Sequence, residues 1–394
     1  MKQPLNRAPQ SRRRRPWLIA TPLAVFVLIA LAWSAFWFYT ASQIGPELDG
    51  WRAREAKAGR IHTCSDQTIG GYPFRIEVDC VNPSVEFQPG STPGFAPAGR
   101  PTVLAAKNIA VVAQVYDPTL LVGEIAGPMT IGEPGQPANL SANWSLAQVS
   151  VRGTPQDPQR ISIAIDRPEV AALNRSAMEL VASASHVELH GRLVSGSVSS
   201  NPVIETVWRM NGAYAPALHP LAAKPTDGEI SATLTGLKDF APKPWNERFR
   251  EIASAGGGIE ITSARLAQGD ILAVGAGKLT VNANGRLDGQ ITLTVAGLDK
   301  LIELLGADQQ LSQLLAQKSG GMNMDKIAGG LDRILPGLGG VVRNNSGSIA
   351  AAGLSMLGEP RDIEGRKGIS LPLKFTDGAV SLGPIPVGSI PAVF

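Results

Sequence analysis

Two cysteines and one histidine, Cys64, Cys80 and His62, lie close together near the start of the chain and are its first candidates for chemistry. They could supply three zinc ligands, but no fourth ligand is apparent beside them. Their separation is not the C-x-x-C of a redox centre. In an oxidising compartment we expect a Cys64–Cys80 disulfide, which would close a loop of about 15 residues and contribute roughly 3 kcal/mol.

Other signs of chemistry are weak. His186 and His190 have the four-residue spacing that binds zinc on a helix, but residues alternate locally with a period of two. We therefore expect both histidines on the polar face of a strand. There is no G-x-S-x-G nucleophile elbow and no Walker A loop. Residues 256–258, three glycines, precede a strand pattern, which favours a helix stop and turn. We predict no cofactor, metal or enzymatic activity, although the sequence does not exclude a carboxylate-based hydrolase.

The N-terminus indicates a membrane anchor. A basic cytoplasmic tail (1–16) precedes an uncharged apolar run (17–39), which is long enough to span a bilayer. The topology signal consists of Arg12, Arg13, Arg14 and Arg15. The aromatic residues that suit the two membrane interfaces are Trp17, Trp33, Trp37 and Tyr39. Residues 30–32 resemble a signal-peptide cleavage site, but the apolar run continues past them, which favours an uncleaved anchor.

The charge of the chain belongs to this tail. Of the 36 basic residues, six precede Tyr39, whereas all 33 acidic residues follow it. The exported part is therefore slightly acidic. Nucleic-acid binding needs a basic stripe, so we expect no nucleic-acid partner.

A stalk helix (40–60) should follow the membrane span. Within Ile44–Ala58, Leu48, Trp51 and Glu55 share one face with Ile44, and Gly59 is a plausible stop. Gly70, Gly71 and Pro73 should then form a turn, and Phe74, Ile76 and Val78 should begin the first strand. A disulfide at Cys80 would fasten the end of that strand to the stalk.

Strand patterns dominate residues 61–394. Apolar residues alternate with polar ones around residues 76–78, 109–115, 161–165 and 187–193. Lys278–Leu298 predicts a hairpin with a turn at Asn284-Gly285. Three Asp-Gly pairs precede alternating residues, which favours either turns or similar hairpins side by side in one sheet. These pairs begin at Asp227, Asp288 and Asp377.

Helices should interrupt these strands. Apolar residues at helical spacing predict helices over Pro244–Ile252, Leu298–Ala316 and Met324–Leu335, and more weakly over Glu169–Val181. Loops are expected at Pro89–Pro101 and Gly132–Pro137. The expected fold is α+β and β-dominated: a transmembrane helix, then a long curved, mostly antiparallel sheet with a few covering helices. Residues 61–394 could divide near residue 225.

These features resemble the bacterial domain of unknown function 2125 family. The resemblance is carried by the membrane helix, Trp51-Arg52, the GGYPFRIEVDC segment between the cysteines, GRLDGQITLTVAG and the terminal FTDGAVSLGPIPVG. It implies a single-pass protein of the bacterial inner membrane, with a cytoplasmic N-terminus and a periplasmic domain. The architecture is also similar to AsmA-like envelope proteins, by fold-level analogy only.

Three functions follow as hypotheses. The apolar sheet face could bind or pass lipid or another hydrophobic ligand in the envelope, because such a face must be buried under helices or under a ligand. Alternatively, the chain could be a structural scaffold that joins envelope protein partners, or the hydrolase considered above.

Overall fold

The computed structural model describes residues 16–89, 100–154, 157–174, 177–218, 220–241, 243–298, 300–301, 358–383 and 385–394. The structure does not describe the four predicted topology arginines or the predicted helix over Met324–Leu335. Most of the predicted helix over Leu298–Ala316 also lies outside the described residues. So does most of the predicted loop at Pro89–Pro101.

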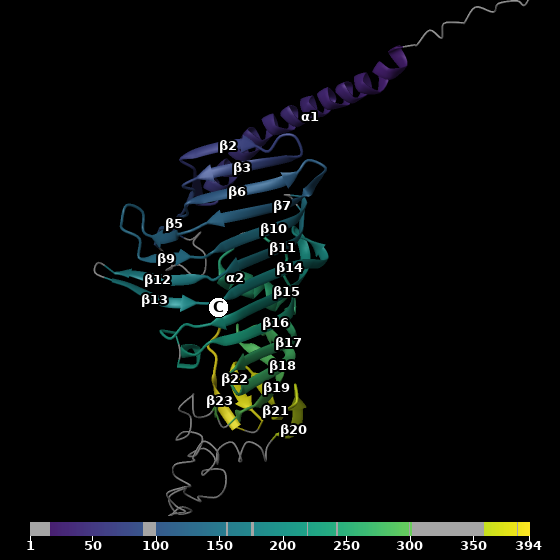
Figure 1. Ribbon diagram of the computed structural model, residues 1–394. Coiled ribbons are helices and arrows are strands. Elements are labelled where there is room, and N and C mark those ends of the chain that lie inside the picture. The colour runs from purple at the N-terminus through teal and green to yellow at the C-terminus, as the bar shows by residue number, and fades with distance from the viewer. Residues whose placement is uncertain are drawn as a thin grey trace, which may run out of the picture.

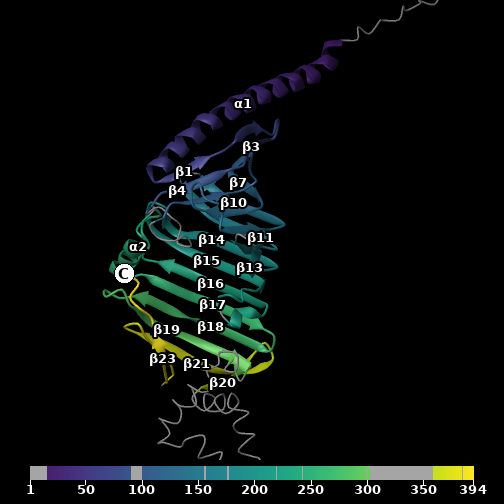
Figure 2. The same ribbon diagram turned by 90° about the vertical axis from the view of Figure 1, so that its left-hand side faces the viewer.

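One long helix, α1 (Pro16–Lys57), contains both the apolar run and the predicted stalk. The stalk therefore continues directly from the apolar run as one unbroken helix. Gly59 follows with a φ of 78°, a left-handed conformation that glycine adopts without strain, and it ends the helix as expected. Figures 1 and 2 show α1 leaving the domain beside its first strands.

The strands form two antiparallel sheets, not the single sheet expected (Figure 1). The smaller sheet has seven strands, in the spatial order β1 (Arg60–Thr63), β4 (Ser84–Phe87), β5 (Thr102–Ala105), β8 (Met129–Gly132), β9 (Leu140–Asn143), β12 (Glu169–Asn174) and β13 (Ala177–Ser183).

The larger sheet has 16 strands and is not closed into a barrel. Its spatial order is β2 (Asp66–Gly70), β3 (Arg75–Val81), β6 (Asn108–Gln114), β7 (Asp117–Ala126), β10 (Leu146–Thr154), β11 (Asp157–Asp166), β14 (His186–Ser197), β15 (Ser200–Ala213), β16 (Thr226–Thr235), β17 (Gly258–Gln268), β18 (Ile271–Val281), β19 (Leu287–Ala296), β21 (Arg366–Thr376), β22 (Ala379–Leu382) and β23 (Ile385–Ser389). β20 (Glu359–Ile363) pairs with β21 off this path.

The chain alternates between the sheets until β14 and then stays in the larger one. Every crossing uses two residues. The chain passes to the larger sheet at residues 64–65, 106–107, 144–145 and 184–185, and returns at 82–83, 127–128 and 167–168. Each return crossing has proline second. This is an internal repeat of roughly 40 residues, within the usual range for repeat architectures.

The register of the larger sheet separates an apolar face from a polar one. On one face, successive cross-strand partners are Ile69, Val78, Val111, Gly123, Val149, Ile163, Leu189, Trp208, Ile230, Ala264, Gly275, Leu293 and Leu371. On the other face, the partners include Glu188, Arg209, Glu229 and Arg265. The register therefore gives the sheet one face that is apolar across its width, while toward the C-terminal end buried apolar residues such as Leu272 and Ala296 lie on the other face as well.

The tightest core lies toward the C-terminal end of the larger sheet, where Leu272, Ala296 and Leu371 are buried. Helix α2 (Trp245–Ser254), predicted over Pro244–Ile252, connects β16 to β17 and buries Ile252. The three glycines that follow lead into β17, as expected. A short 3-10 helix, η1 (Pro220–Ala223), precedes β16.

Several local predictions are confirmed and others are wrong. The alternating segments and the Lys278–Leu298 hairpin are strands, and the predicted loop at Gly132–Pro137 lies between β8 and β9. The weak helix over Glu169–Val181 is wrong, because this segment forms the β12–β13 hairpin. The strand that contains Ile76 is the third strand, not the first. Of the three Asp-Gly pairs, only Asp377-Gly378 is a turn between strands, since Asp227 and Asp288 lie inside β16 and β19.

Candidate functional site

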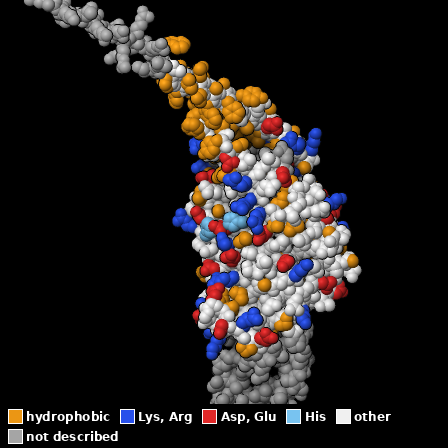
Figure 3. All heavy atoms as spheres, turned by 90° about the vertical axis from the view of Figure 1, so that its right-hand side faces the viewer, with side chains coloured by type: hydrophobic (Ala, Val, Ile, Leu, Met, Phe, Trp, Pro, Cys, Tyr) orange, Lys and Arg blue, Asp and Glu red, His pale blue; other side chains and the backbone are white. Residues whose placement is uncertain are grey.

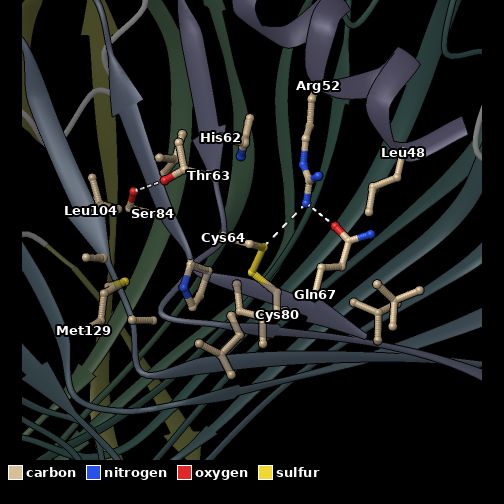
Figure 4. A pocket seen from close by; sticks show the side chains of 18 of the residues that line it. Leu48, Arg52, His62, Thr63, Cys64, Gln67, Cys80, Ser84, Leu104 and Met129 are labelled. Atoms are coloured by element: carbon tan, nitrogen blue, oxygen red, sulfur yellow. Dashed lines mark hydrogen bonds between the residues drawn. A yellow bond between two sulfur atoms is a disulfide. The ribbon is translucent and has the colours of Figure 1, made fainter. Parts of the chain in front are cut away.

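An apolar cavity of about 370 Å³ lies between the two sheets where α1 ends. Its volume falls in the range of small-molecule sites. The larger sheet contributes Val78 and Val111, and the smaller sheet contributes Val85 and Leu104. Leu48 and Trp51 of α1 also line it, which confirms that the face predicted for the stalk is the one that packs on the domain. We call this space the proximal cavity; Figure 4 shows side chains that converge on it.

A second cavity of about 470 Å³, the distal cavity, lies further along the sheets. Val187, Trp208 and Ile230 line it from the larger sheet, and Val170 and Ala182 line it from the smaller one. Trp208 and Ile230 remain 54% and 41% exposed. Large apolar side chains that neighbour one another and remain this exposed are a sign of a ligand or interaction surface.

Apolar side chains also pack between the two cavities. Ile125 lines the proximal cavity and Ile165 lines the distal one, and Ala147, the register partner of Ile165, is buried between them. The smaller sheet faces this strip with its own apolar partners, such as Met129, Ala142 and Val170. Apolar side chains thus line the space between the sheets at both cavities and at the packed strip between them, and we call this whole region the inner groove.

The two cysteines paired by the sequence analysis lie at disulfide distance, with Cα atoms 5.7 Å apart. Cys64 occupies the first crossing between the sheets and Cys80 lies in β3. Both line the proximal cavity (Figure 4). The bridge therefore holds together the corner where the inner groove begins. His62 lies nearby, but no metal-binding group of three or more His, Cys, Asp or Glu side chains occurs among the described residues.

The turn between β2 and β3 packs on the apolar part of α1. Trp33 Nε1 donates a hydrogen bond to the carbonyl oxygen of Pro73, and Trp37 Nε1 donates one to that of Arg75, both at 2.8 Å. The ring of Tyr72 lies edge-on to Trp37. Two of the four predicted interfacial aromatics thus hold the helix to the domain, whereas Trp17 and Tyr39 are exposed.

Comparison with protein families gives one result that covers nearly the whole chain. The profile of the family described as "Uncharacterized protein conserved in bacteria (DUF2125)" matches residues 37–391. The chain belongs to the DUF2125 family. The matched range includes both sheets and both cavities. A search of curated proteins finds no match for this chain. The similarity to AsmA-like proteins stays a prediction.

In this DUF2125 protein, the polar face of the larger sheet carries a ladder of charged side chains (Figure 3). As expected, His186 and His190 lie on a strand, on this face. His186 Nδ1 lies 2.6 Å from Asp166 Oδ1, and its Nε2 lies 2.9 Å from Glu188 Oε1. Arg209 pairs with Glu188 from the next strand. The apolar lining of the distal cavity comes from residues of the opposite parity, such as Val187, Trp208 and Ile230, while Glu188 and Arg209 of the ladder border the same cavity.

We expect this ladder to make the stability of the DUF2125 protein depend on pH. Hydrogen bonds to Glu188 and Asp166 raise the pKa of His186, and hydrogen bonds from His186 and His190 lower the pKa of Glu188 to about 2. The His186 contribution is therefore complete below its unfolded pKa of roughly 6.5 and is lost as pH rises through the higher folded pKa. We expect the melting temperature to fall slightly as the pH rises through this range. The loss of unfolding free energy should be less than about 1 kcal/mol, because these groups are partly exposed.

Thermal melts of the full-length protein between pH 5 and pH 8 measure this effect. His186→Gln removes the titrating group and should flatten that part of the profile. An unchanged slope in His186→Gln would show that the ladder does not cause it.

Proposed function

We propose that this protein is a membrane-anchored envelope protein whose inner groove binds or passes a lipid. The observation that carries the proposal is the apolar interior between the two sheets, with a cavity beside the helix that could enter a membrane. A sheet that is apolar across its whole width needs an apolar partner, and acyl chains have the shape and chemistry of a long groove.

The membrane assignment rests on α1. Its apolar part is long enough to cross a bilayer, and its side chains are almost wholly exposed in the absence of a membrane (Figure 3). A signal sequence has the same composition. We favour an anchor in the bacterial inner membrane, with the N-terminal arginines in the cytoplasm and residues 61–394 in the periplasm, because the arginine block precedes the apolar run.

The direct test is mass spectrometry of lipids that the full-length protein retains after purification in a detergent with a short chain. We expect acyl-bearing molecules in roughly stoichiometric amount. A protein that is folded and free of acyl chains would refute the lipid proposal and would favour the scaffold, whose test is recovery of a reproducible partner from solubilised membranes.

The β2–β3 turn provides a test of the membrane assignment. Tyr72 and Phe74 are exposed beside Trp33 and Phe38 of α1, so this turn should lie at the bilayer surface, where aromatic residues are enriched. The chain has no free cysteine, so Phe74→Cys gives a single site for a nitroxide label. In nanodiscs we expect this label to collide with oxygen more than with a water-soluble nickel chelate.

A label at Lys367→Cys, on an exposed residue near the far end of the larger sheet, is the matched control and should show aqueous accessibility. Equal nickel accessibility at both positions would place the turn away from the bilayer and would remove this support for an anchored α1.

A further inference from the structure

Among the described residues that line the proximal cavity, one is a cation and the others are apolar or neutral. Arg52, on the stalk part of α1, points into it with Leu48 (Figure 4). The remaining lining is apolar except for neutral polar groups such as Gln67 and Thr63, and no carboxylate is among the described residues that line the cavity.

The partners of Arg52 leave its charge poorly neutralised. Its Nη2 donates to Gln67 Oε1 at 2.5 Å and lies 3.5 Å from Cys64 Sγ, both uncharged groups. Its one ionic partner among the residues that the structure describes is Asp49, at 3.4 Å, whose side chain is 75% exposed. An exposed pair of this kind contributes little, whereas a guanidinium in an apolar cavity favours a close anion.

The neighbouring charges do not fill this role. The half-buried carboxylate of Glu55 on α1 accepts hydrogen bonds from Nε and Nη2 of Arg60 at 2.5 and 2.8 Å. Burial lowers the pKa of His62, so its ring is neutral near pH 7 and adds no second cation. The cavity therefore combines one positive group with apolar walls.

We infer that the proximal cavity recognises the anionic head group of a lipid, with Arg52 as the head-group ligand and the inner groove holding the acyl chain. This inference rests on the proposed lipid function and specifies its ligand class: an amphiphile whose head is a carboxylate or a phosphate. Arginine suits both, because its planar fork can donate two parallel hydrogen bonds to either.

The position of Arg52 also implies that the lipid leaves the bilayer. A helix rises about 1.5 Å per residue, so Arg52 lies about 20 Å along α1 beyond Tyr39. A head group bound there has moved out of the plane of its neighbours. The protein then acts on an extracted lipid and does not merely contact the lipids around its anchor.

The experiment uses three photoreactive probes of equal chain length, each with a diazirine in the chain: a fatty acid, a phosphatidic acid and a fatty alcohol. The full-length protein is labelled in phosphatidylcholine nanodiscs, and peptide mass spectrometry counts adducts on the strands that line the cavities. We expect the acid probes to label these strands at least fivefold more than the alcohol. Arg52→Gln should abolish this preference, so that the acid probes label the strands no more than the alcohol does.

The comparison of the two acid probes shows whether a carboxylate or a phosphate is preferred. Asp49→Asn, which removes only the exposed partner, should keep the preference for acids. Equal labelling by acid and alcohol in the wild type, or a preference that survives Arg52→Gln, would overturn the role of Arg52 while leaving the groove intact. Failure of all three probes to label the strands would instead refute the lipid function itself.

Discussion

Replacing Val187 by glutamate is expected to lower the lipid retained by the full-length protein at least tenfold. Val187 lines the distal cavity, and its register partners Ile165 and Met210 line it too. An acyl chain laid over this point would cover the carboxylate and remove it from water, which costs several kcal/mol. Since about 1.4 kcal/mol corresponds to a tenfold change in affinity, a tenfold loss is a low estimate.

Val207→Glu is the matched control. Val207 is a half-buried valine of the adjacent strand, but it belongs to the polar face and is the register partner of His190. It should retain lipid at the wild-type level. Circular dichroism melts of both variants would separate a loss of binding from a loss of folding. A folded Val187→Glu protein with its full lipid content would exclude the distal cavity from binding.

Cys64→Ser should destabilise the corner between the first strands by about 3 kcal/mol, the chain-entropy value for a loop of this length. The effect should be local, because the 16-stranded sheet can open at its edge without unfolding as a whole. Hydrogen exchange measured by mass spectrometry should therefore show faster exchange in β2 and β3 and unchanged exchange in β18 and β19.

Cys80→Ser and the double variant complete the test. If the bond is the cause, all three variants should exchange alike, and a reductant should bring the wild type to the same rate. If exchange in β2 and β3 is the same in the wild type and in the variants, and a reductant does not change it in the wild type, the bridge adds no stability.

The strands were predicted correctly where apolar and polar residues alternate along the sequence. A half-buried strand is indicated by local sequence alone at Ile161, Ile163 and Ile165. The hairpin at Asn284-Gly285 is specified by its own turn residues. Glu169–Val181 failed because its alanines and leucines are good helix formers, while pairing with β9 and between its own halves decides the outcome.

The second sheet could not be inferred from local pattern. A two-residue connection such as Asn82-Pro83 reads as a tight turn between neighbouring strands, yet it carries the chain to the other sheet. The only available signal was the spacing of these connections, with proline second at each return. The Asp-Gly pairs do not mark this repeat, because two of the three lie inside strands.

For the candidate site, the disulfide pair and the apolar faces could be predicted from the sequence. That α1 and the two sheets come together around one cavity could not. Leu48 and Trp51 were placed on the correct face of the helix, and Arg52 was visible only as part of a resemblance. Its contact with Gln67 joins two elements whose packing no local pattern encodes. Gln67 itself carries no signal that would have marked it.

The two-residue crossings also make the molecule modular. Each roughly 40-residue unit adds two strands to each sheet, which lengthens both by about 10 Å at the usual strand spacing. A unit could be gained or lost without altering the corner at Cys64 or the C-terminal core, because each unit meets only its neighbours. The number of units would then set the length of the two sheets in the direction across their strands. Relatives with longer or shorter chains should differ by whole units.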